Sequence, residues 1–169
     1  MPAQIMIIDF DLDFLSAAVA LVDAGLARLD NDARSSADPD AFGIFDELEY
    51  LTGFGFVACQ TYATAVTSRS PLRNKKREAL ALGPKHRTGR SMAQLTNAAA
   101  NYWKHSPESS FEVPSAQAEQ TIKVISSLGV DISASYPIAN ALHEILTPHP
   151  ARFANLVPFL TQWRDALPK

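Results

Sequence analysis

The chain has 169 residues, of which 47% are hydrophobic and 20% charged, and its formal net charge is −3. This length suffices for one well-buried core and is too short to expect two, so we expect a single domain over residues 1–169. The small net charge does not mark the whole chain as a nucleic-acid binder. Cys59 is the only cysteine, which excludes an internal disulfide, and the N-terminus makes a poor secretory signal. We therefore expect a cytoplasmic protein.

The first predicted element is a long amphipathic helix, because its apolar residues follow an alternating spacing of four and three. They are Ile8, Leu12, Leu15, Val19, Val22, Leu26, Leu29 and Ala33. The same region contains IMIIDFDLD, which resembles the start of haloacid-dehalogenase-like enzymes, where an aspartate at the end of a strand is the nucleophile. No alternation of strands and helices follows here, as that fold requires. We therefore interpret Asp9, Asp11 and Asp13 as acids that favour the positive end of the helix dipole.

The second helix contains Tyr50–Ser68, nineteen residues without a charge. A helix with no charged face must be covered nearly all round. Its length approaches that of a membrane span, but it carries several Thr, Ser and Gln residues and continues the apolar face of the acidic segment before it. We therefore interpret it as the central helix of a core, and we expect no membrane association.

A short loop joins these two helices and predicts an antiparallel helical hairpin. Asp38 as N-cap and Pro39 as first residue predict that the second helix runs from there to about Thr67. Its predicted inward face is Ile44, Leu48, Leu51, Gly55, Ala58, Tyr62 and Ala65. The two faces predict contacts of Leu15, Val22 and Leu26 with Leu48, Ala58 and Tyr62.

Further helices are predicted down the chain, and no convincing pair of strands is found. Their ranges are Lys75–Leu82, Ser91–Lys104, Ser115–Leu128, Pro137–Leu146 and Ala151–Leu167, the last with a kink at Pro158. The predicted fold class is therefore all-α, a helical bundle built on a long antiparallel hairpin.

The charge is divided unevenly along the chain. Residues 1–50 hold eleven acids against two arginines, whereas residues 69–105 hold nine bases against Glu78. A basic cluster of this kind can hold phosphates, and the candidate nucleic-acid-binding residues are Arg73, Lys75, Lys76, Arg77, Arg87 and Arg90. The alternative is a solvated connector that lies against the acidic first hairpin.

A polar stripe of Asn97, Asn101 and His105 runs along the Ser91–Lys104 helix, because these residues recur every four positions. They could satisfy a buried polar contact, with His105 finishing the helix, or orient an imidazole for proton transfer. The stretch NAAANYWKH resembles the HEPN family of all-helical domains, whose active members are metal-independent ribonucleases with an arginine before the histidine. The resemblance implies Asn101, Lys104 and His105 as candidate catalytic residues. The family's arginine is missing, because positions 98–100 are alanine.

No metal or cofactor is expected, since the histidines do not occur in a Glu-x-x-His motif. As function we expect a non-enzymatic binding or interaction module, for example an inhibitor or immunity protein whose acidic hairpin covers a basic site. The alternative is a HEPN-like ribonuclease or its inactive relative. The expected partners are RNA or a protein, and a second copy in a two-fold homodimer, where acidic and basic patches would meet twice.

Overall fold

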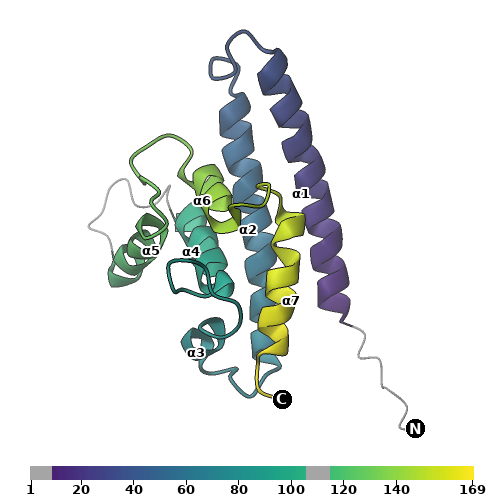
Figure 1. Cartoon of the computed structure of the whole chain (residues 1–169), viewed down its shortest axis with the longest axis vertical. Coiled ribbons are helices and arrows are strands. Elements are labelled where there is room, and N and C mark those ends of the chain that lie inside the picture. The colour runs from purple at the N-terminus through teal and green to yellow at the C-terminus, as the bar shows by residue number, and fades with distance from the viewer. Residues whose placement is uncertain (1–8, 106–114) are drawn as a thin grey trace.

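The computed structural model describes residues 9–105 and 115–169, and its elements are helices (Figure 1). In chain order they are α1 (Phe10–Ser35), α2 (Ile44–Ser68), α3 (Lys76–Leu80), α4 (Met92–His105), α5 (Ala116–Ser126), α6 (Pro137–Leu146), the 3-10 helix η1 (Phe153–Asn155) and α7 (Val157–Asp165). Within those ranges no strand forms, and the sole sheet-like pairing is an isolated bridge between Lys85 and Ser91. The predicted all-α class is confirmed.

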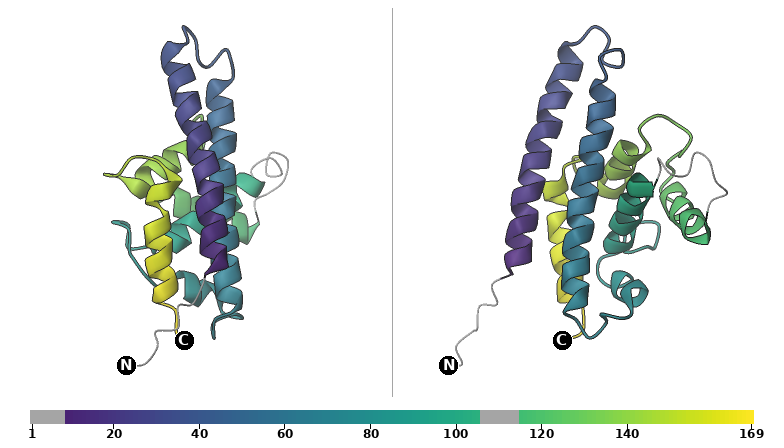
Figure 2. Two further views of the ribbon diagram at one scale, coloured as in Figure 1. Left: turned by 90° about the vertical axis from the view of Figure 1, so that its right-hand side faces the viewer. Right: turned by 180° about the vertical axis from the view of Figure 1, so that it is seen from behind.

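The two longest helices, α1 and α2, run side by side in opposite directions (Figures 1 and 2). Asp9 caps α1 by accepting the amide of Leu12 at 3.1 Å, and it also accepts the hydroxyl of Tyr62 near the far end of α2 at 3.2 Å. Half-way up the hairpin, Gly25 packs directly against the side chain of Leu51. As predicted, the core is formed by Leu15, Val22, Leu26 and Tyr62, which are buried, with Leu48 and Ala58 partly buried against them.

The start of α2 differs from the prediction. The helix begins at Ile44 rather than at Pro39, after Gly43 in the left-handed region at φ 68°. The carboxylate of Asp38 does accept a backbone amide, that of Ala41 at 3.1 Å, but this bond closes a turn instead of opening the helix. The chain therefore turns once more before α2, at a residue that tolerates a positive φ.

The C-terminal segment is not one kinked helix, as the sequence predicted. It consists of η1 followed by α7, and Pro158 lies in the first turn of α7. A proline costs little there because first-turn amides have no partner within the helix. Asp23 of α1 fixes the start of η1 by accepting the amides of Phe153 and Ala154, each at 2.8 Å.

Two glycines allow α2 to be covered closely. A Cβ atom on Gly55 would lie 2.2 Å from the ring of Phe153, and one on Gly53 would lie 2.2 Å from the ring of Trp103. Gly55 belongs to the inward face predicted from the sequence, and the ring of Phe153 lies against it. Phe153 also packs edge-on against Phe56 at 5.1 Å between ring centroids.

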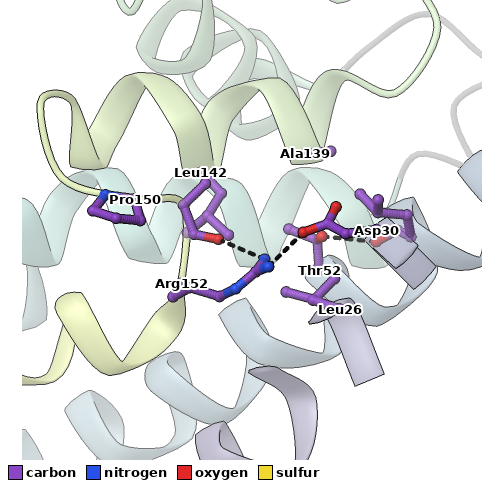
Figure 3. A pocket seen from close by; sticks show the side chains of 9 residues that line it. Leu26, Asp30, Thr52, Ala139, Leu142, Pro150 and Arg152 are labelled. Carbon is purple, nitrogen blue, oxygen red and sulfur yellow. Dashed lines mark hydrogen bonds and ion pairs between the residues drawn. The ribbon is translucent and has the colours of Figure 1, made fainter. Parts of the chain in front are cut away.

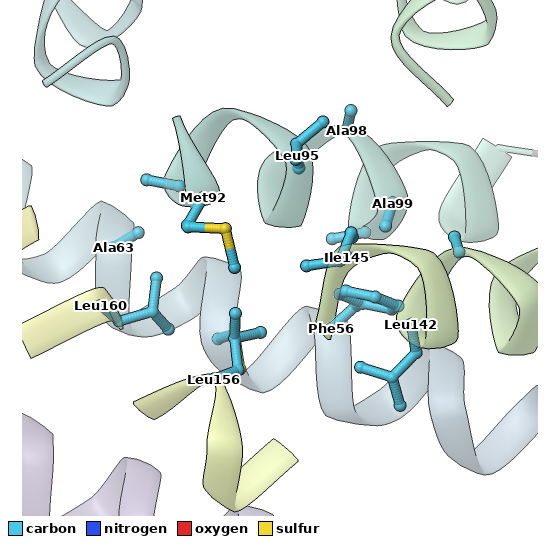
Figure 4. Packing of buried hydrophobic residues seen from close by; sticks show 14 of the residues in the cluster. Phe56, Ala63, Met92, Leu95, Ala98, Ala99, Leu142, Ile145, Leu156 and Leu160 are labelled. Carbon is cyan, nitrogen blue, oxygen red and sulfur yellow. The ribbon is translucent and has the colours of Figure 1, made fainter. Parts of the chain in front are cut away.

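The main core lies where α2, α4, α6 and α7 meet (Figure 4). Phe56, Leu95, Leu142 and Leu160 are among its fully buried side chains. Cys59 is also buried, and burial raises the pKa of its thiol. Among the described helices, none combines the length and apolar character that a membrane span requires.

Candidate functional site: a cation-lined groove beside α4

A buried amide network joins the central helix α2 to α4. Gln60 of α2 is only 7% exposed, and the ammonium of Lys104 donates to its Oε1 at 2.7 Å. An ammonium can only donate, so Nε2 of Gln60 must face the other way. There it donates to Oδ1 of Asn97 at 2.9 Å and to Oδ1 of Asn101 at 2.8 Å. The asparagine stripe thus satisfies a buried polar contact between helices, one of the two interpretations of the sequence.

This network determines what the two asparagines can offer to a ligand. Their carboxamide oxygens accept hydrogen bonds from Gln60, so the remaining polar group of each side chain is its NH2 donor. Both Asn97 and Asn101 also line a groove on the outer side of α4. The network therefore supplies this groove with two oriented hydrogen-bond donors.

The groove has a volume of about 770 Å³ and lies between α3, α4 and α5. Its described lining residues are Lys76, Arg77, Leu80, Arg90, Gln94, Asn97, Ala98, Asn101, Ala116, Gln117, Gln120, Thr121 and Val124. Three of these side chains are cations and five are carboxamides, and none of the described lining residues is a carboxylate. Such a lining is suited to an anion.

The cations of the groove are held by anchored segments. Trp163 of α7 donates through its indole nitrogen to the carbonyl of Ala79 at 2.9 Å, which fixes α3 against the core. Before α4, the amide of Ser91 donates to Oε1 of Gln94 and the amide of Gln94 donates to Oγ of Ser91, both at 3.0 Å. This reciprocal cap fixes the start of α4 and the adjoining Arg90.

The electrostatics of the groove favour a negative ligand. Burial lowers the pKa of Lys76, and the positive charge of Lys104 lowers it further. Neither Arg77 nor Arg90 forms an ion pair with another residue of 9–105 or 115–169. A bound anion would relieve the repulsion between these cations and raise the pKa of Lys76.

The structure separates the six predicted nucleic-acid-binding residues into two groups. Lys76, Arg77 and Arg90 line the groove. The other three lie outside its lining: Arg73 is exposed, Lys75 pairs with Glu78 at 3.3 Å, and Arg87 pairs with Glu144 of α6.

The three predicted catalytic residues lie near one another on α4 but differ in surroundings. Asn101 lines the groove, and Lys104 lies one turn further on, bound to Gln60. His105 is the last residue of α4 and is exposed. The sequence did not single out Gln60, although it is the one long amide in the charge-free stretch of α2 and a buried polar group of this kind requires partners.

The basic segment meets the acidic hairpin at two points. Arg69 pairs with Asp11 of α1, and Lys76 donates to the hydroxyl of Thr64 in α2 at 3.4 Å. Within the described ranges no other base of residues 69–90 pairs with an acid of α1. The other cations that neutralise α1 come from elsewhere in the chain, for example Arg152 on Asp30 and Arg164 on Asp9.

A smaller pocket of about 280 Å³ lies between the hairpin and α6 (Figure 3). Leu26, Thr52 and Leu142 line it, and Arg152 points across it to Asp30. Because this ion pair is already complete, the pocket has no excess charge to offer a ligand. The described ranges also contain no group of three side chains that could hold a metal ion.

The fold and the groove define an all-α helical-bundle domain with a cation-lined cleft on one side. Comparisons with protein-family models, with curated proteins and with solved structures find no match for this chain.

Proposed function

We propose that the chain is a non-enzymatic binding module that holds the backbone of single-stranded RNA in the groove beside α4. One observation carries this proposal: Lys76, Arg77 and Arg90 converge on one groove with oriented amide donors and no carboxylate among its described lining residues. Phosphate groups bind such arrays of cations and hydrogen-bond donors, and they release counterions when they do so.

The shape of the donor array favours a strand over a single phosphate. Gln94, Asn97 and Asn101 follow one another along the same face of α4, and a rise of 1.5 Å per residue makes this row roughly 10 Å long. A carboxamide can also bond the 2′-hydroxyl that distinguishes RNA from DNA. The described lining contains no aromatic ring on which a base could stack, so we expect little sequence preference.

An RNA-binding module is preferred to an inhibitor that covers a basic partner with its acidic hairpin. Nine of the eleven acids in that hairpin already accept hydrogen bonds or form ion pairs within the chain. Their charge is therefore less available to a partner than the charge of the groove.

The experiment compares two triple variants by fluorescence anisotropy with a labelled oligouridine at low salt. The groove variant is Lys76→Ala, Arg77→Ala, Arg90→Ala, and its matched control is Arg73→Ala, Lys75→Ala, Arg87→Ala. Both remove three charges from the same segment. The groove variant should weaken binding on the order of 100-fold and the control by less than about fivefold. Equal losses would contradict a groove site, and no binding by the wild type would contradict the function.

A HEPN-like ribonuclease is the second candidate, favoured by the position of His105 at the exposed end of α4, one turn beyond Asn101. In that reaction His105 would act as general acid or base on a ribose 2′-hydroxyl or the leaving oxygen, and cations would stabilise the developing charge. His105→Ala should then abolish cleavage and retain binding. Intact RNA after prolonged incubation with the wild type would eliminate this candidate and leave the binding module.

A further inference from the structure

One side of the helical hairpin carries large apolar side chains that are more than half exposed, although Tyr50 and Phe54 contact the ring of Trp103 in α4. On α1, Phe10, Phe14 and Leu21 are 65%, 73% and 78% exposed, and on α2, Tyr50 and Phe54 are 62% and 56% exposed. Positions 10, 14 and 21 share one face of α1, and positions 50 and 54 share one face of α2. We name these five residues the hairpin face.

The two halves of the hairpin face lie on the same side of the molecule. The opposite side of the hairpin is covered by η1 and α7, through the bonds of Asp23 to Phe153 and of Asp9 to Arg164. The two helices touch where Gly25 meets Leu51. On both α1 and α2, the exposed face lies on the other side of this contact from η1 and α7. Figure 2 (right) shows this side of α1 and α2 toward the viewer, with α7 behind them.

We infer that the hairpin face is the interface of a two-fold homodimer, in which the hairpins of two copies pack as a four-helix layer. An aromatic side chain presents about 150–250 Å², so the four exposed aromatic residues alone leave on the order of 500 Å² of apolar area in solvent. This area is at the upper end of about 300–600 Å² for the largest patch of an ordinary monomer. A stable dimer buries about 800 Å² on each partner, so this face supplies most of what is needed.

The charges at the two ends of the hairpin favour a second copy in the antiparallel orientation. The turn end carries the exposed acid Asp46, whereas the other end of α2 leads into the exposed base Arg73, and neither forms an ion pair within the described ranges. An antiparallel two-fold axis brings the acidic end of each copy to the basic end of its partner. The sequence predicted a homodimer in which acidic and basic patches meet twice, and the hairpin face gives it an apolar centre with these charges at the rim.

The test measures the mass of the full chain by light scattering and sedimentation over a wide concentration range, for the wild type and three variants. A monomer has a mass of 18.4 kDa. Leu21→Lys and Phe54→Lys each place a charge in the hairpin face, and Ala20→Lys places the same charge on an exposed neighbour about 100° around α1. Circular dichroism confirms the helical content of each variant.

The wild type should form a dimer that the Ala20→Lys variant retains. Leu21→Lys and Phe54→Lys should each weaken it on the order of 100-fold, because an unpaired charge is buried twice across a two-fold axis. A wild type that stays a monomer at every concentration would overturn the inference and leave the face to a different protein. A dimer that survives both face variants unchanged would overturn the assignment of the surface. Neither result bears on the RNA groove, which shares no residue with the hairpin face.

Discussion

The acidic hairpin and the basic groove differ in how their charges are used. In the hairpin, Asp23 and Glu49 each accept two backbone amides at the start of another helix, and Asp9 binds Arg164 of α7. In the groove, Arg77 and Arg90 have no ion-pair partner in the described ranges. Charges of the first kind position helices, whereas those of the second kind are available to a ligand. Net charge per segment, which is all that composition gives, does not separate the two cases.

The largest expected effect on stability is in the hairpin core. Leu26 of α1 is 2% exposed and belongs to the hydrophobic core. Leu26→Ala should therefore lower the free energy of unfolding by about 2–5 kcal/mol. Chemical denaturation measures this loss. The folded variant should bind RNA with the affinity of the wild type, because Leu26 is not among the described residues that line the groove. A parallel loss of affinity in fully folded protein would contradict the separation of scaffold and site.

Gln60 is the residue that connects the two regions, and its replacement should affect both. Gln60→Leu removes the acceptor of Lys104 and the donor to Asn97 and Asn101, which should cost about 1–3 kcal/mol because buried polar groups lose their partners. RNA affinity should fall as well, since the two asparagines lose their fixed orientation. The exposed neighbour Thr61 provides a control, and Thr61→Ala should leave affinity unchanged. Unchanged affinity in Gln60→Leu would show that the amides do not contact RNA.

A pH dependence should identify Asp9 as part of the scaffold. Burial alone would raise the pKa of Asp9, but hydrogen bonds from Arg164, the amide of Leu12 and Tyr62 hold its pKa below the usual value. A lowered pKa in the folded state contributes stability above the unfolded pKa of about 3.9, and this contribution is lost as the pH falls through the folded pKa. Asp9→Asn should therefore cost about 1–2 kcal/mol at neutral pH, and this cost should shrink as the pH falls below the unfolded pKa. Unfolding free energies of both proteins across this range measure the difference; a constant difference would contradict the ionic role.

The smallest effect is expected at a surface ion pair in the basic segment. Lys75 and Glu78 are 3.3 Å apart and both side chains are about 60% exposed. Glu78→Gln should change the free energy of unfolding by less than about 0.5 kcal/mol. It should also leave RNA binding nearly unchanged, because this pair lies outside the described groove lining. A strong gain in RNA affinity would instead indicate that Lys75 reaches the strand once it is released.

The sequence predicted the helices well because helix formation depends on the pattern of residues close to one another in the chain. The apolar spacing in α1 and the charge-free stretch of α2 are properties of neighbouring residues, and the predicted burial of Leu26 and Tyr62 is confirmed. The two errors, at Pro39 and Pro158, concern helix ends, where a proline can open a helix or precede a further turn. The backbone angle that proline prefers is compatible with both the first turn of a helix and a turn that precedes it.

Only part of the candidate site was predicted from the sequence, because the groove forms by contacts between segments that are distant in the chain. The sequence identified the basic segment and the stripe of Asn97 and Asn101. It could not separate Lys76, which lines the groove, from Lys75, which points to Glu78, since adjacent residues differ only in the direction that α3 gives them. Gln60 becomes recognisable only when α2 and α4 are in contact.

The most direct test of RNA binding in the groove is the salt dependence of affinity in the two triple variants. For single strands the logarithm of the affinity falls with the logarithm of the salt concentration by about 0.7 for each phosphate neutralised. Replacement of Lys76, Arg77 and Arg90 by alanine should therefore flatten the slope by about 2 relative to the wild type. Replacement of Arg73, Lys75 and Arg87 should leave the slope nearly unchanged. Equal flattening in both variants, or none in the groove variant, would contradict the proposal that these three cations hold the strand.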